Sequence, residues 1–190
     1  MIKRTWVALG LVAACGGGKP ATAPGGDKMG KMDSMMMSNN GMPVDDASKF
    51  APLEVGADWQ SYTKVNKASF KSETHGGRMV DTYVNNVGLD AFKKSEDMPV
   101  GSILVKTSKD SDDGTEGPVF VMEKRAPGFN KAHGDWWFAI HWASPPASWA
   151  KKLGGPIYWR TPSKKAAYCA DCHDDYVTGV GGVPDEQKAW

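Results

Sequence analysis

The most constraining feature of this 190-residue chain is a Cys-x-x-Cys-His run near its C-terminal end. It consists of Cys169, Cys172 and His173, with Ala170 and Asp171 between the cysteines. Such a run is the usual attachment site of a c-type haem. The two thiols add to the vinyl groups of the porphyrin, and the adjoining histidine is close enough to ligate the iron. The sequence therefore predicts one covalent haem c, held by Cys169 and Cys172, with His173 as the proximal iron ligand.

Other uses of a Cys-x-x-Cys pair stay open: a thioredoxin-like redox pair, half of a zinc site, or a local disulfide. A thioredoxin-like pair belongs to a βαβ unit, and no such alternation surrounds this stretch of the sequence. Zinc would need two further ligands, and the third cysteine, Cys15, has a different explanation. Covalent haem is therefore the favoured interpretation.

The first residues have the pattern of a lipoprotein signal peptide. Lys3 and Arg4 form a basic start, residues 6–14 are mostly apolar, and small residues precede Cys15. The apolar run is too short to cross a bilayer. We expect residues 1–14 to be the signal and Cys15 to be lipidated; an ordinary secretory signal is the alternative. The lipid would then be the sole membrane anchor, placing the chain in a bacterial cell envelope, at the outer membrane and facing the periplasm.

The remaining chain divides into a tether and a domain. Residues 15–46 are rich in Met, Gly and Pro and contain no aromatic residue, so we expect a flexible tether. Its six methionines could bind Cu(I), although incidental methionines explain them more simply. Residues 47–190 form the predicted haem domain. The formal net charge of +1 gives no field that would attract nucleic acid, so we expect no nucleic-acid partner.

The pattern of the domain indicates short strands joined by turns rather than regular βα alternation. Alternating and β-branched runs predict four strands, over 78–84, 103–107, 119–124 and 136–143. Short helices are expected over 88–94 and within 55–65. This order is typical of an α+β domain with an antiparallel sheet and a few short helices.

The strand over 136–143 carries large apolar residues on both faces. Trp136, Phe138 and Ile140 share one face, and Trp137 and Ala139 share the other. Three explanations fit this pattern: a central strand buried twice, a face that contacts haem or a second subunit, or ordinary core packing.

Several segments in series resemble the cytochrome P-460 family. They are His75-Gly76, Thr82-Tyr83-Val84-Asn85, Gly101-Ser102-Ile103-Leu104-Val105-Lys106, Gly134-Asp135-Trp136-Trp137-Phe138, and Cys169 to His173 followed by Asp175-Tyr176-Val177. The resemblance covers about residues 59–177, and the related cytochromes c′-beta share the fold. It implies an antiparallel sheet, commonly a homodimer, with a five-coordinate haem whose open position takes a small molecule.

The resemblance also implies a function and a further site residue. Members with cytochrome P-460 activity oxidise hydroxylamine, and related proteins bind or process nitric oxide. We expect a cytochrome as the redox partner of this chain. Some carry a lysine joined covalently to the porphyrin, and Lys106 matches its position. From the residues alone, Lys106 could instead end its strand and extend to water. The expected function is therefore a haem oxidoreductase of small nitrogen species or, alternatively, a non-catalytic electron-transfer or nitric-oxide-binding cytochrome.

One departure from the family bears on catalysis. Hydroxylamine-oxidising members place a carboxylate in the pocket from the stretch before the first haem cysteine, and residues 162–168 contain no acid. A proton acceptor for N–H oxidation therefore has no obvious source in the sequence. Side chains that could instead provide a sixth iron ligand are His75, His133, His141, Met98 and Met122, although such residues more often pack in the core; His133, in a polar turn, is expected to be solvated.

Overall fold

The structure, a computed structural model, describes residues 46–190. The predicted signal peptide, the lipidation site Cys15 and nearly all of the 15–46 tether lie outside the described residues. Within residues 46–190, no helix is both long and apolar enough to pass through a bilayer.

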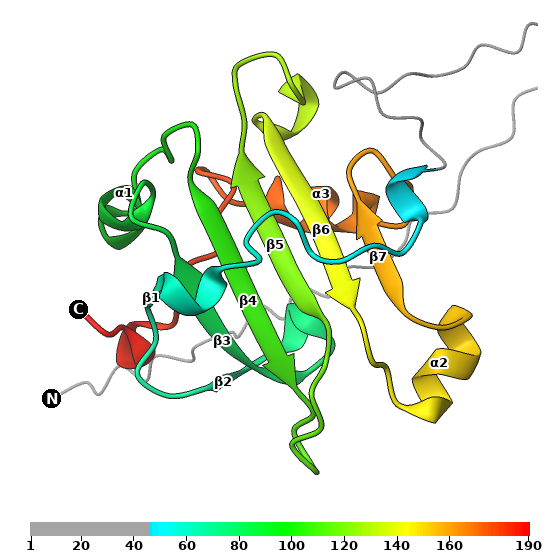
Figure 1. Ribbon diagram of the computed structural model, residues 1–190. Coiled ribbons are helices and arrows are strands. Elements are labelled where there is room, and N and C mark those ends of the chain that lie inside the picture. The colour runs from blue at the N-terminus through cyan, green and yellow to red at the C-terminus, as the bar shows by residue number, and fades with distance from the viewer. Residues whose placement is uncertain (1–45) are drawn as a thin grey trace, which may run out of the picture. The chain divides into compact units, whose positions relative to one another are not determined.

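Seven strands within the described residues form one antiparallel sheet (Figure 1). The strands are β1 (Thr63–Lys64), β2 (Phe70–Ser72), β3 (Arg78–Val84), β4 (Ile103–Lys109), β5 (Val119–Lys124), β6 (Trp136–Trp142) and β7 (Ile157–Arg160). The order across the sheet is β1-β3-β4-β5-β6-β7, and β2 also pairs with β3. From β3 to β7, each strand lies beside the next one in the sequence, as expected of hairpin-linked antiparallel strands.

Short helices connect and flank the strands. The α-helices are α1 (Leu89–Lys94), α2 (Ala147–Leu153) and α3 (Ala167–His173); the 3-10 helices are η1 (Asp46–Ser48), η2 (Trp59–Ser61), η3 (Glu73–His75), η4 (Lys131–His133) and η5 (Asp185–Gln187). The predicted α+β class with an antiparallel sheet and a few short helices is confirmed. Figure 1 shows α3 and the chain that follows it behind the sheet, whereas the segment leading from η1 to η2 crosses the front.

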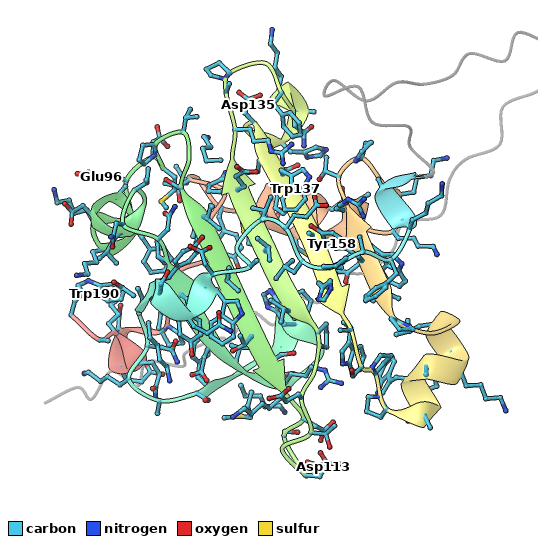
Figure 2. All side chains as sticks on the ribbon, viewed as in Figure 1. Glu96, Asp113, Asp135, Trp137, Tyr158 and Trp190 are labelled. Atoms are coloured by element: carbon cyan, nitrogen blue, oxygen red, sulfur yellow. The ribbon has the colours of Figure 1, made fainter. Side chains whose placement is uncertain are left out.

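Strand β6 is an interior strand that is buried on both faces, the first of the explanations considered for its apolar pattern. Behind the sheet, Trp136 and Phe138 pack with residues of β4 and β5 in one core cluster. In front, Trp137 packs with Tyr158 and residues of the N-terminal segment in a second cluster (Figure 2). Full burial of one such side chain contributes roughly 1.5–3 kcal/mol, so both layers stabilise the sheet.

The prediction of a short helix within 55–65 is wrong. The chain there forms turns at residues 55–58 and the single 3-10 turn η2 before β1, and it packs against the front of the sheet. Gly56 explains the difference, because its φ of +72° is unfavourable for other residues and a Cβ there would lie 2.8 Å from Val105 Cγ2. The chain approaches the sheet too closely at this point for a helix to continue.

Candidate functional site

A cavity of about 790 Å³ lies against the sheet. One row of paired residues crosses five strands and forms its floor: Thr82 on β3, Lys106 on β4, Phe120 on β5, Ile140 on β6 and Trp159 on β7. Directly paired residues of antiparallel strands point to the same side of a sheet, so the row presents one continuous surface. Apart from Thr82 and Lys106, this row is aromatic or aliphatic. The floor therefore suits a large apolar group.

Helix α3 provides a wall of the same cavity. Its Cys169, Cys172 and His173 all contribute to the lining. Residues three and four positions apart lie on the same face of a helix, so the Cys-x-x-Cys-His spacing turns both sulfurs and the imidazole to one side. Ala170 is buried against the core with Trp136 and Phe138, which fixes the helix on the sheet.

His173 is oriented by the loop that follows it. Its Nδ1 lies 2.8 Å from the carbonyl oxygen of Gly179. Because a carbonyl accepts hydrogen bonds and cannot donate them, Nδ1 carries the hydrogen and Nε2 keeps its lone pair. Burial, the largest influence, lowers the pKa of His173 and favours the neutral imidazole. Neutral imidazole with an anchored Nδ1 is the form that ligates a metal.

A second hydrogen bond fixes the end of α3. Asp174 Oδ2 and His133 Nδ1 are 2.7 Å apart and join this helix end to η4. The expectation that His133 is merely solvated is therefore wrong, although its side chain remains partly exposed. Asp171 and Asp175, which flank the motif, are exposed.

Lys106 lies in the middle of the floor, between Thr82 and Phe120. Burial lowers the pKa of its amine to about 8. The ion pairs formed within residues 46–190 do not include Lys106. An ammonium removed from water without a charged partner is costly, so this lysine loses its proton more easily than an exposed one. Lys106 does not end its strand, because β4 continues to Lys109, and its partly exposed side chain lines the cavity.

The remaining candidates for a sixth ligand divide into two groups. His75 and Met122 line the cavity. His141 points to the front of the sheet, where its Nε2 lies 3.2 Å from the carbonyl oxygen of Ala51. Met98 is buried in the core cluster around Phe92, and His133 is bonded to Asp174. Position in the fold therefore selects His75 and Met122 from the five.

Among residues 46–190, the acidic side chains that line the cavity are Glu73 and Asp185, and both lie at its edge. Both side chains are largely exposed, at 77% and 92%, and each contacts a lysine, Lys71 and Lys188 respectively. Neither is placed to accept a proton deep in the cavity.

The residues of the cavity fit a haem. Apolar side chains offer contact to a macrocycle, and two sulfurs and an imidazole lie together on α3. Thr82 Oγ1 and Arg78 Nη1, from two residues that line the cavity, are buried without a hydrogen-bond partner among the described residues. A guanidinium suits the carboxylates of such a cofactor. Residues 46–190 contain no cluster of three or more His, Cys, Asp or Glu residues that could hold a bare metal ion.

Fold and site together define a class: an antiparallel α+β domain whose sheet and Cys-x-x-Cys-His helix enclose an apolar, cofactor-sized cavity. The sequence matches the family described as Cytochrome P460 over residues 57–178, more than half of the chain. The protein therefore belongs to the cytochrome P460 family, which confirms the resemblance noted in the sequence. This family membership implies a haem cofactor. None of the curated proteins compared with the chain matches it.

Proposed function

We propose that the protein is a c-type haem protein that binds and oxidises small nitrogen species, hydroxylamine or nitric oxide, at a five-coordinate haem. The observation that carries this proposal is the common cavity of Cys169, Cys172 and His173 with an apolar floor. When bound, haem supplies a redox-active iron with one position open to a small molecule. Cys169 and Cys172 would hold the porphyrin by thioethers, and His173 would ligate the iron through Nε2.

The anchoring of His173 supports this role. Its hydrogen bond to Gly179 holds the ring in one tautomer and one direction, and the Phe138 ring packs against it at 5.5 Å between centroids. A ligating histidine usually donates its second ring N–H in this way. The protein thus presents a ligand that needs no rearrangement.

Lys106 is the proposed site of a second covalent link to the porphyrin edge. A pKa of about 8 leaves a useful fraction of neutral, nucleophilic amine near neutral pH. Joining Nζ to an edge carbon removes one hydrogen from each partner, so the step needs a two-electron oxidant such as peroxide or dioxygen. Replacing Lys106 by Met should return the optical spectrum to that of an ordinary c-type haem. An unchanged spectrum in the variant contradicts the link.

A second candidate function is a non-catalytic cytochrome that binds nitric oxide or transfers electrons. It is favoured by the absence of acids from residues 162–168 and by the exposure of Glu73 and Asp185. Hydroxylamine oxidation requires a group that accepts protons, and carboxylates do not provide it here.

The two functions are separated by adding hydroxylamine and an electron acceptor to the purified holoprotein. Catalytic reduction of the acceptor over many turnovers supports the oxidase. Binding of nitric oxide to the reduced protein without turnover supports the second candidate. A reduced spectrum that nitric oxide and hydroxylamine both leave unchanged contradicts the oxidase and nitric oxide binding, and leaves electron transfer as the function.

We further propose that the chain is exported and anchored in the cell envelope through a lipid on Cys15, with a periplasmic cytochrome as redox partner. The support is the signal-like pattern of residues 1–14 and the compartment in which c-type haem is attached. Metabolic labelling with a radioactive fatty acid tests the anchor. Label in the wild type and none in Cys15→Ser is expected, and equal labelling contradicts it.

A further inference from the structure

His75 is a cavity-lining imidazole that the Cys-x-x-Cys-His motif does not explain. It ends η3, and Gly76 directly after it has a φ of +76°, which turns the chain away. Its Nδ1 lies 2.8 Å from Ser72 Oγ and 3.2 Å from Thr74 Oγ1. Among the described residues, the hydrogen bonds of this ring all involve Nδ1, so Nε2 is the nitrogen left for a ligand.

The surroundings hold the His75 ring in place. Its edge packs against Phe120, with ring centroids 4.8 Å apart and planes at 76°. Phe120 is the neighbour of Lys106 in the cavity floor. Ser72, which anchors Nδ1, is itself 9% exposed, so this contact is protected from water. The imidazole is therefore a fixed polar group beside the centre of the floor.

The charge state of His75 is also defined. Burial lowers its pKa most, and electrostatic interactions with Lys106 and His173 lower it further, to about 3. The ring is consequently neutral across the physiological pH range, and one of its two nitrogens carries a hydrogen while the other keeps a lone pair. Whether Ser72 donates to Nδ1 or accepts from it, Nε2 keeps one hydrogen-bonding function, as donor or as acceptor.

Other polar groups of the cavity are less suited to contact a small ligand. In the proposed function, Lys106 has its Nζ joined to the porphyrin edge, and His173 has its Nε2 committed to the iron. Burial, the largest influence, raises the pKa of Tyr168 to about 12, so its phenol does not accept a proton. Glu73 and Asp185 are exposed at the edge. His75 is thus the neutral nitrogen base that the cavity offers beside the floor.

We propose that His75 hydrogen-bonds through Nε2 to the small nitrogen or oxygen ligand held at the iron, replacing the carboxylate that residues 162–168 lack. The inference rests on the proposed haem function. It makes His75 a ligand-contacting residue rather than an iron ligand. Ser72 acts as its positioning residue, because it fixes the ring through Nδ1.

Spectroscopic ligand titration of the holoprotein tests this role. His75→Phe keeps an aromatic ring in contact with Phe120 but has no ring nitrogen. His75→Gln places a hydrogen-bonding amide near the position of Nε2. The probes are azide and hydroxylamine for the ferric protein, and carbon monoxide, a poor hydrogen-bonding ligand, for the ferrous protein. His141→Phe, on the front of the sheet and outside the cavity lining, is the matched control.

We expect His75→Phe to lower the affinity for azide and hydroxylamine about tenfold, the effect of one hydrogen bond. Carbon monoxide affinity should stay within about twofold on the same reasoning. His75→Gln should recover most of the loss, and His141→Phe should change neither affinity. Equal azide and hydroxylamine affinities in wild type and His75→Phe overturn the inference and leave the proposed function intact. A low-spin ferric spectrum that becomes high-spin in His75→Phe also overturns it, because His75 would then be an iron ligand. If the wild type binds none of the three probes, both the inference and the proposed function fail.

Discussion

Gly179→Ala tests how the loop after α3 controls His173. Gly179 has a φ of +71°, and a Cβ at this position would lie 2.6 Å from Trp136 Nε1 and 3.0 Å from Trp136 Cδ1. Trp136 is 2% exposed and cannot move outward without opening the core. The loop itself must therefore shift, and with it the carbonyl that accepts the hydrogen bond from His173.

The size of the effect follows from two contributions. An alanine forced into left-handed backbone costs about 1–2 kcal/mol, and overpacking against a rigid neighbour costs a further 1–3 kcal/mol, roughly. We expect Gly179→Ala to lower the free energy of unfolding by about 2–5 kcal/mol, combining these contributions. The hydrogen bond to His173 Nδ1 should lengthen, which weakens the ligand and changes the reduction potential of a haem bound there.

Gly114→Ala is the matched control. Gly114, in the loop between β4 and β5 and outside the cavity lining, has a similar φ of +73°, but nothing lies within 4 Å of its Cβ position. It should lose only the backbone contribution of about 1–2 kcal/mol and leave the haem spectrum and potential unchanged. Urea unfolding and potentiometry of the two holoproteins make the comparison. Equal stability losses in the two variants, or an unshifted potential in Gly179→Ala, would refute the reasoning.

Three further expectations follow. Burial holds the pKa of Lys106 near 8 against 10.5 in the unfolded chain, so this amine binds fewer protons in the folded apoprotein between these values; it should raise the unfolding free energy across pH 8–10.5 by about 3 kcal/mol. Urea unfolding of haem-free protein should show this rise as a growing difference between the wild type and Lys106→Met, because the other ionisable groups, Cys169 included, are common to both; a difference that does not change with pH contradicts the burial of this amine. Replacing both Cys169 and Cys172 by Ala should make the haem extractable by acidified acetone, and haem retained by the chain counts against thioether attachment. Asp174→Asn removes a partly exposed contact with His133 and should cost less than about 1 kcal/mol in urea unfolding; a loss several times larger shows a greater role for this contact.

The sheet was largely predictable because its longer strands have strong local patterns. The bounds expected for β3 and β5 agree with the structure, and the ends of β4 and β6 differ by one or two residues. β1, β2 and β7 span only two to four residues, too few for a periodic pattern to stand out. The N-terminal segment was misjudged because its conformation depends on contact with Val105, which no local pattern reveals.

The candidate site was predictable where its chemistry is local in sequence. Cys169, Cys172 and His173 lie within one helical turn and a half, so their spacing alone brings them together. The importance of His75 could not be read in the same way, since it was one of five candidates and no local pattern favoured it over the others. Its selection depends on η3 packing over Phe120 and on the distant position of His141, both of which are tertiary features.

The central claim is that an iron porphyrin is attached to Cys169 and Cys172 within this cavity. Mass spectrometry of the tryptic peptide spanning residues 166–188, from protein produced in a host that matures c-type haem, tests it most directly. The account predicts that this peptide carries the mass of one haem, alone or joined to the peptide that contains Lys106. Recovery of the unmodified peptide from a colourless protein would contradict it.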